Sequence, residues 1–412
     1  MTFKNIVANY IGTGLVGLIN IFSLSLYVKW LGMTQWGEVA TYLAIMNGLM
    51  VLEMGISQIY IAQYHKQDAP SNLFLKFRST LLSLVLAGGL VTFTGLLVLS
   101  WVIADFPTIY QRWDLLLMAL GLFGFNLVNN FYYTNLMAVG RQVEQNLRWV
   151  SFVLLKNVLA LTMVVFISNL PEIYFLAFLM VAGLELWMNG KTAQVPLTAF
   201  CRWAEIISVV KQSGLISLAI GLGVLVFSLD RLVMPSLMTS EAFGIYSAVV
   251  TIGLYFLQLQ YPITKALFPA LAKKINLNPQ SAGAAMWQQA FILGGVLAPL
   301  LLIAALCADQ ILGFYSVPKV YLENARWLFH GILFAVLINA VYHGIYMRLV
   351  VEGRDRLIAF INFSTLVVVL SILIGLGAAA PFVAGALAWC SISGIQLLGS
   401  AVFYRWLRHA IR

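Results

Sequence analysis

Charged residues are scarce in this sequence. They make up 9% of the 412 residues, whereas hydrophobic residues make up 61%. Soluble globular proteins typically contain about 25% charged residues. The composition therefore excludes an ordinary soluble protein and indicates a membrane protein that crosses the bilayer several times.

Sequence motifs for catalysis are also missing. The three cysteines, Cys201, Cys307 and Cys390, are scattered and odd in number, so they indicate no disulfide pairing. We find no metal-ligand spacing, nucleophile motif or glycine-rich phosphate cradle. We therefore expect no catalytic residue, no bound metal and no cofactor.

Long hydrophobic runs fill the sequence instead. A helix needs about 20 predominantly apolar residues to cross a bilayer, so we predict an all-α polytopic membrane protein with twelve transmembrane helices. The first run lacks a small-residue cleavage site after a short apolar core, so we interpret it as a retained helix. The predicted spans are 6–30, 37–63, 79–104, 113–138, 147–169, 173–190, 213–236, 241–270, 285–307, 327–350, 357–379 and 382–405.

Lysine and arginine are unevenly divided between the two ends of these spans. Seventeen of the 24 lie on the side of the N-terminus. Because cytoplasmic loops retain positive charge, we expect both termini in the cytoplasm and the protein in the inner, cytoplasmic membrane. Basic loops beside anionic lipid account for the net charge of +9, so no nucleic-acid partner is expected. The four basic residues on the outer side are Lys29, Arg112, Lys319 and Arg326.

Polar residues follow one face of several predicted spans, because a helix turns by about 100° per residue. Spans one, two, seven and eight carry the clearest stripes, which a cavity between two lobes explains. The stripe of span four is also compatible with hydrogen bonds between helices. Members of the stripes are Asn9, Thr13 and Asn20 in span one, Tyr42, Glu53, Ser57 and Tyr60 in span two, Asn126, Asn130 and Tyr133 in span four, Ser217, Gly221, Ser228 and Arg231 in span seven, and Ser247, Thr251, Tyr255, Gln258 and Lys265 in span eight.

Charged residues at membrane depth are the strongest functional candidates, because each costs about 2.5–3.5 kcal/mol at a helix centre. Arg231 completes a polar stripe, whereas we expect Asp230 to serve the bundle itself. The two side chains leave the helix about 100° apart, so a direct ion pair between them is geometrically awkward. Two alternatives stay open for Lys156: a structural ion pair with Glu185, or a place in the substrate site. The six deep charges are Lys156, Arg231, Lys265, Glu53, Glu185 and Asp230.

The chain is predicted to divide into two six-helix bundles, 1–195 and 213–412. Apolar residues recur at helical spacing in the segment 196–212 between them, which predicts a cytoplasmic interfacial linker helix. A weak repeat pairs Trp36-Gly37 with Phe243-Gly244. Six spans in each half keep both halves in the same orientation, as in transporters with parallel repeats.

Three short motifs stand out at the ends of the spans. They are Leu31-Gly32 through Gly37, Leu229-Asp230-Arg231 followed by Phe243-Gly244-Ile245-Tyr246, and Gln310-Ile311-Leu312-Gly313-Phe314-Tyr315. With these motifs in this order, the sequence resembles the multidrug/oligosaccharidyl-lipid/polysaccharide (MOP) exporter superfamily over essentially its whole length. Within that superfamily it resembles the Wzx-type polysaccharide flippases.

The resemblance implies a V-shaped, MATE-like pair of bundles with a central cavity lined by spans one, two, seven and eight. It implies a flippase that moves a polyprenyl-diphosphate-linked oligosaccharide to the outer leaflet, with membrane lipid and glycan assembly proteins as partners. Lipid II flippases of the superfamily usually have two more helices. A chain of twelve favours a repeat unit of O-antigen lipopolysaccharide or exopolysaccharide.

Arg231 and Lys265 are the residues we expect to hold the diphosphate, because arginine binds phosphate oxygens bidentately and lysine adds a point charge. Glu53 and Asp230 are candidates for coupling transport to protons. The full set of predicted substrate-binding residues is Arg231, Lys265, Gln258, Tyr255, Thr251, Asn20, Glu53, Tyr60, Asn126, Asn130 and Lys156.

Two other functions fit parts of the sequence. The first is a cation-coupled multidrug antiporter of the same superfamily, which needs an anionic or apolar cavity. The second is a membrane glycan polymerase or glycosyltransferase. The outer segment from Asp309 to Arg326 is short for an enzyme of that kind, so we expect a transporter and not an enzyme.

Overall fold

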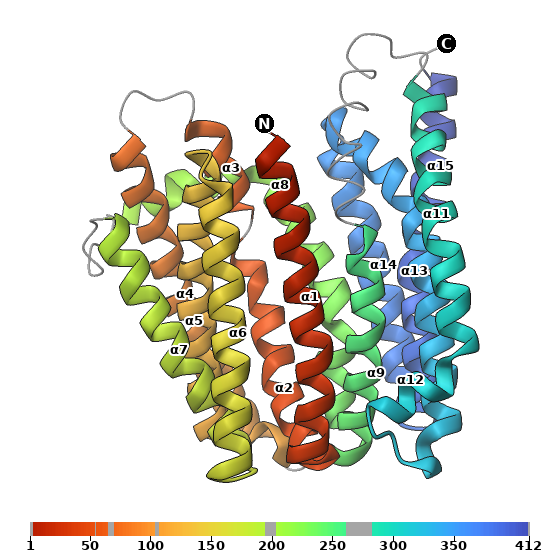
Figure 1. Ribbon diagram of the computed structural model, residues 1–412. Helices are drawn as coiled ribbons and strands as arrows, with labels where there is room; N and C mark the ends of the chain where they lie inside the picture. Colours follow the sequence, from red (N-terminus) through yellow and green to blue (C-terminus); the bar gives the residue numbers. More distant parts are fainter. Residues whose placement is uncertain are drawn as a thin grey trace. The chain divides into compact units, whose positions relative to one another are not determined.

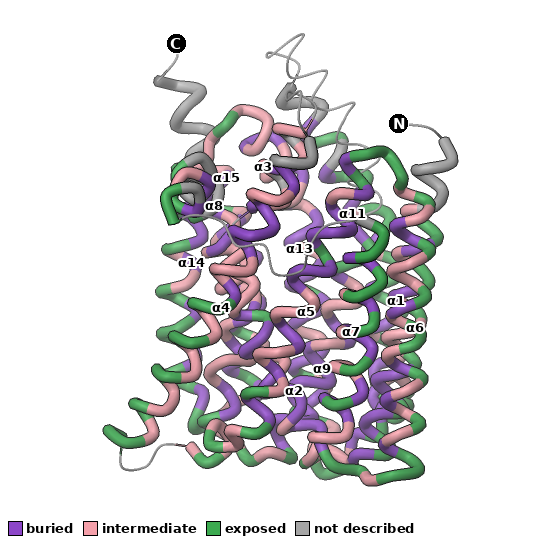
Figure 2. The backbone as a smooth tube through the Cα atoms, turned by 90° about the vertical axis from the view of Figure 1, so that its left-hand side faces the viewer, coloured by how far each residue is buried: buried purple, intermediate pink, exposed green. Residues whose placement is uncertain are grey.

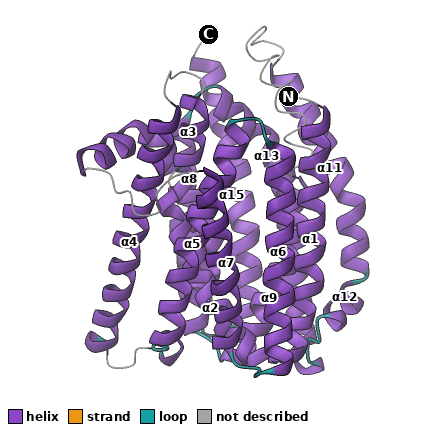
Figure 3. Ribbon diagram, turned by 60° about the vertical axis from the view of Figure 1, so that its left-hand side comes forward, coloured by secondary structure: helices purple, strands orange, loops and turns teal. Residues whose placement is uncertain are grey.

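The computed structural model describes residues 3–53, 55–64, 70–103, 107–193, 203–260 and 282–410. These residues are almost entirely helical, and Figure 3 shows no strand among them. Eleven of the described helices are long and apolar enough to cross a membrane. The chain is therefore an all-α, multi-pass membrane protein.

The chain forms two compact units, Met1–Val224 and Leu225–Arg412. The first contains α1 (Phe3–Leu31), α2 (Met33–Leu49), η1 (Met50–Glu53), α3 (Ile56–Tyr64), α4 (Pro70–Val102), η2 (Thr108–Tyr110), α5 (Trp113–Ala138), α6 (Gln142–Phe166), α7 (Pro171–Ala193) and most of α8 (Trp203–Val233). The second contains the end of α8, η3 (Met234–Ser236), α9 (Ser240–Gln258), α11 (Ala282–Leu306), α12 (Ala308–Phe314), η4 (Lys319–Tyr321), α13 (Leu322–Val351), α14 (Asp355–Leu376) and α15 (Pro381–Ala410).

In the first unit, α5 packs against α4 and α7, and α6 packs against α1 and α7 (Figure 1). Most residues of α4 are exposed or half-buried, as Figure 2 shows. Its uncovered side chains are apolar, for example Val91, which is 69% exposed. An apolar helix surface of this kind is suited to contact with lipid.

Arg112 joins three helices at one end of the first unit. It forms ion pairs at 2.9 Å with Glu38 of α2 and with Asp114 of α5, and a further one with Glu172 of α7. The hydrogen bond with Asp114 and the surrounding carboxylates raise the pKa of Arg112 above its usual range. Arg112 therefore stays charged and keeps these helix ends together.

The uninterrupted helix predicted for 37–63 is wrong. α2 ends at Leu49, a 3-10 turn follows, and α3 begins at Ile56. Gly55 has a φ of +66°, a conformation that glycine adopts without a steric penalty. The Glu53 carboxylate accepts hydrogen bonds from the backbone N–H groups of Gly55 (3.0 Å) and Ser57 (2.8 Å). Backbone N–H groups at the start of a helix have no partner within the helix, and this carboxylate binds two of them. It thereby stabilises the break before α3.

The boundary predicted between a linker helix and the seventh span is missing from the described residues. α8 instead runs without a break from Trp203 to Val233. Helical spacing of apolar residues is the same in an interfacial helix and in the extension of a spanning helix, so the sequence pattern could not distinguish them. Residues 196–202 of the predicted linker lie outside the described part.

α13 is the central helix of the second unit and packs against α9, α11 and α15. Small residues allow its closest approach to α15. A Cβ atom added at Gly331 would lie 2.7 Å from the Cβ of Ala386 and 3.1 Å from its backbone Cα. Close contact through small residues is the usual way for membrane helices to pack tightly.

We predict that Gly331→Ala destabilises the protein, because α13 and α15 must move apart. Overpacking of this kind costs about 1–3 kcal/mol. The matched control is Gly375→Ala in α14, where an added Cβ has no atom within 4 Å. Thermal unfolding in detergent should show a lower midpoint for Gly331→Ala and an unchanged or higher one for the control. Equal midpoints for the two variants would contradict the packing argument.

Candidate functional site

Asp230 is the centre of a buried polar cluster in the second unit. Its side chain lies near the end of α8 and its residue is 1% exposed. Its Oδ2 accepts hydrogen bonds from the Tyr246 hydroxyl of α9 and from the Trp389 indole Nε1 of α15, both at 2.9 Å. The predicted direction of Asp230, into the bundle, is confirmed. Its role in coupling stays a prediction.

One hydrogen bond of this cluster joins two short sequence motifs and gives a physical reason for both. The turn between α8 and α9 is short, so Asp230 and Tyr246 come from the two motifs on either side of it and meet in one hydrogen bond. Thr239 caps the start of α9 by accepting a hydrogen bond from the Ala242 N–H at 3.3 Å. The turn and its cap thus bring the Tyr246 hydroxyl to the carboxylate.

Arg231 is half-buried beside this cluster and has few partners. Its side chain is 11% exposed, and its Nη2 donates to the Phe227 carbonyl oxygen at 2.7 Å. Its Nε lies 3.7 Å from Asp230 Oδ1, so the two charges are in ionic contact even though their positions on the helix diverge. That distance is too long for a hydrogen bond. Among the described residues, neither of these two atoms has a hydrogen-bond partner.

The first unit contains a second buried charge cluster. Lys156 Nζ of α6 lies 2.7 Å from Glu185 Oε2 of α7, and their side chains are 12% and 2% exposed. From α5, the Asn126 amide oxygen accepts from Lys156 at 3.1 Å and the Tyr133 hydroxyl donates to Glu185. The structural ion pair is therefore present.

Neighbouring amides extend this cluster along α5 and α7. Asn189 Nδ2 donates to Asn129 Oδ1 at 3.0 Å, and Asn129 Nδ2 donates to the Ala182 carbonyl oxygen at 3.1 Å. Arg148 Nη1 donates to Asn189 Oδ1 at 3.3 Å. The polar stripe predicted for span four thus divides: most of it binds helices together, whereas Asn130 is exposed.

The other predicted site residues differ in their burial and in the hydrogen bonds that they form within the protein. Tyr60 is fully buried among Phe74, Phe77 and Phe131, and its hydroxyl donates to Asn135 Oδ1 at 2.5 Å. The carboxylate of Glu53 caps α3. Half-buried or exposed positions are held by Asn20, Thr251, Tyr255 and Gln258. Lys265 lies outside the described residues.

Several buried polar residues were not predicted. Gln260 donates to Asn339 at 2.9 Å, and Gln396 donates to Asn362 at 3.1 Å. Trp389 was also missed, although an indole N–H within an apolar span needs an acceptor. No group of three or more His, Cys, Asp or Glu side chains in the described part of the chain could hold a metal ion.

No protein-family model and no curated protein matches the chain. Solved structures do match. The lipid II flippase MurJ in an inward closed conformation matches with a TM-score of 0.67 at 12% identity, covering 98% of this chain and 88% of that one. An inward-facing multidrug resistance MATE family transporter of the MOP superfamily matches with 0.66 at 13%, covering 96% and 94%.

A third similar structure is a MOP superfamily transporter from Pyrococcus furiosus, described as having a binding pocket of reverse polarity. It matches with a TM-score of 0.66 at 15% identity, covering 99% of this chain and 95% of that one. Identities this low show a shared fold. The chain therefore has the fold of the MATE transporters and of MurJ, and the predicted fold class is confirmed.

We predict that Lys156 and Glu185 are strongly coupled in stability. Lys156→Met or Glu185→Gln alone leaves a charge buried without its partner, which costs about 3–5 kcal/mol. The double variant removes both charges and should regain most of that loss. The measurement is the free energy of unfolding in mixed micelles, as a double-mutant cycle.

The control for this cycle is Lys191→Met on α7. Lys191 is exposed and lies 3.9 Å from the ring centroid of Trp187. An exposed cation–π contact contributes about 0.5–1 kcal/mol, so this variant should change stability little. If the effects of the two single substitutions simply add in the double variant, the buried pair is not coupled and the prediction is wrong.

Proposed function

We propose that this protein is a flippase that carries a polyprenyl-diphosphate-linked oligosaccharide from the inner to the outer leaflet of the cytoplasmic membrane by alternating access. The observation that supports this most is the incompletely bonded guanidinium of Arg231. Among the described residues, one buried atom of this guanidinium, Nε, has no hydrogen-bond partner. Polar atoms left in this state require an explanation, and a ligand bound to the guanidinium is one. The diphosphate is the ligand with the matching charge and shape.

The bonding of Arg231 favours an anion in particular. A guanidinium has five N–H donors and no acceptor. Among the described residues, its only hydrogen bond is the one to the Phe227 carbonyl oxygen. Asp230 compensates part of its charge, but Tyr246 and Trp389 already bind that carboxylate. Arg231 therefore keeps donors for phosphate oxygens, which accept them bidentately. Lys265 stays the second predicted diphosphate ligand.

The sugar headgroup needs neutral hydrogen-bonding partners. Its hydroxyls lose hydrogen bonds to water in hydrocarbon, at a cost of roughly 2–7 kcal/mol each if nothing replaces them. In the second unit, Gln258 is exposed and Thr251 is half-buried. Amide and hydroxyl groups of this kind both donate and accept, so they replace water around a sugar. The lipid tail stays in the bilayer.

The membrane potential is sufficient to bias this transport. A negative charge that leaves a negative interior gains about 2.3 kcal/mol per 100 mV. With the termini in the cytoplasm, as we propose from the basic loops, export of the diphosphate is the favourable direction. Proton coupling through Glu53 or Asp230 is a further proposal. Both carboxylates accept hydrogen bonds within the protein, and protonation would weaken these bonds.

A cation-coupled multidrug antiporter is the second candidate, since the fold also occurs in MATE transporters. Cationic cargo needs an uncompensated acid. Glu185 is paired with Lys156, and Asp230 is in contact with Arg231. Glu53 is the one deep carboxylate without a cation among the described residues, and it binds two backbone N–H groups. Glu53 is therefore the acid that a cationic cargo requires, whereas the unused donors of Arg231 support anionic cargo.

Arg231→Ala is the direct test. In proteoliposomes with a fluorescent polyprenyl-diphosphate oligosaccharide, flipping should fall by about tenfold or more, since hydrogen bonds to charged groups contribute about 1.5–3 kcal/mol. Arg231→Lys should retain part of the rate, because it keeps the charge but not the bidentate geometry. Arg356→Ala, an exposed arginine of α14, is the matched control and should leave the rate unchanged.

Unchanged flipping by Arg231→Ala at equal protein levels would reject the diphosphate assignment. A parallel assay of the wild-type protein measures proton-dependent uptake of a cationic dye. Dye uptake without lipid flipping would favour the antiporter instead.

A further inference from the structure

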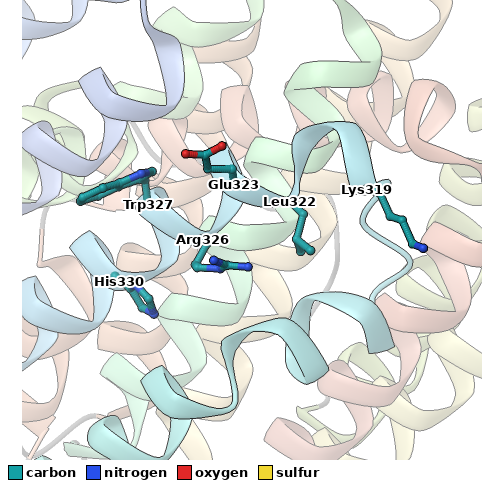
Figure 4. Close-up of a pocket in the computed structure, with 6 residues that line it drawn as sticks. All are labelled: Lys319, Leu322, Glu323, Arg326, Trp327 and His330. Carbon is teal, nitrogen blue, oxygen red and sulfur yellow. The ribbon is translucent and has the colours of Figure 1, made fainter.

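A pocket of about 480 Å³ lies in the second unit (Figure 4). It is formed by η4 and the first turns of α13, the segment that contains two of the four basic residues predicted on the outer side. Its lining residues are Lys319, Leu322, Glu323, Arg326, Trp327 and His330. It is separate from the Asp230 and Arg231 cluster, which has no residue in its lining.

Two neighbouring rows of α13 provide most of the lining. Leu322, Arg326 and His330 follow each other at intervals of four residues, and so do Glu323 and Trp327. Residues at this spacing are neighbours on one helix surface. Figure 4 shows Leu322, Arg326 and His330 along one side of the segment.

Two of the lining side chains are held in place by neighbouring helices. Arg326 donates from Nε and Nη2 to the two carboxylate oxygens of Asp309 in α12, at 2.8 and 2.9 Å. His330 Nε2 lies 3.1 Å from the carbonyl oxygen of Ala305 in α11. An exposed ion pair contributes little to stability. Its main effect is to fix the position of the guanidinium.

Three other lining side chains are exposed. Lys319 and Glu323 are exposed and form no hydrogen bond or ion pair within the described part of the chain. Trp327 is 63% exposed. Exposed tryptophans are common at membrane interfaces, where they anchor helices. Here the indole lies beside a charged donor and a charged acceptor, which anchoring does not require.

The charges of the pocket are balanced. Arg326 is matched by Asp309, and Lys319 and Glu323 carry opposite charges on the same rim. Such a pocket has little electrostatic preference for an anion or a cation. Its donors, acceptors and aromatic face instead match a sugar, whose hydroxyls donate and accept and whose C–H groups pack on a ring.

We infer that this pocket binds a neutral oligosaccharide. The inference rests on the proposed function and names a second subsite for the same substrate, on the outer side, where the glycan headgroup is held after translocation. A volume of about 480 Å³ falls within the range of about 300–1,000 Å³ of ligand pockets and accommodates a few sugar units.

Saturation-transfer NMR on the full chain in lipid nanodiscs tests this inference without a sugar detergent. The probes are chitotriose, maltotriose and mannotriose, with inorganic pyrophosphate as the anionic comparison. Wild-type protein should transfer saturation to ring protons of at least one sugar. Trp327→Ala should weaken that binding by about tenfold, as expected for loss of an aromatic contact. Trp101→Ala, an 84% exposed tryptophan at the end of α4, is the matched control and should bind like wild type.

Three results would overturn the inference: no transfer to any of the sugars, equal loss in both tryptophan variants, or tighter binding of pyrophosphate than of every sugar. Glu323→Gln, which keeps the helix and removes the charge, gives a second measurement and should weaken binding. Flipping rates of the same proteins separate the two proposals. Sugar binding without Arg231-dependent flipping rejects only the proposed function, and Arg231-dependent flipping without Trp327-dependent binding rejects only this subsite.

Discussion

A bilayer has no water in its core, so each polar group on a membrane-spanning helix needs a partner within the protein. In the first unit, the pair of Lys156 and Glu185 is surrounded by donors and acceptors from α5. In the second, Asp230 joins α8, α9 and α15. These two clusters bind together helices whose outer surfaces are otherwise apolar, and they explain why charges persist at that depth.

The same requirement distinguishes the deep charges by how completely they are bonded within the protein. The Glu185 and Asp230 carboxylates accept hydrogen bonds from buried donors, so the bundles use them. Arg231 is bound less completely, and its unused donors distinguish it from Lys156. The break at Glu53 follows the same rule, because the carboxylate satisfies backbone groups that the interrupted helix exposes. Irregular backbone in a membrane protein needs such compensation.

The fold alone does not determine the cargo. Similar folds occur in structures described as a lipid II flippase and as multidrug transporters. Function is carried by the side chains placed on such a scaffold. In this chain, the side chains that bear on the cargo are Glu53, a carboxylate without a cation among the described residues, and Arg231, a guanidinium with one hydrogen bond there.

The sequence by itself determined the helical class, most of the membrane spans and the different helix faces of Asp230 and Arg231, because hydropathy and helical periodicity are local properties. Only the tertiary structure decided which partner each polar group has. Trp389 meets Asp230 across 159 residues, and no local pattern encodes such a contact. The interruption after α2 and the continuity of α8 also depend on backbone conformation, to which average hydrophobicity is insensitive. The pocket beside Trp327 needs α11 and α12 to position its side chains, so it exists only in the folded bundle.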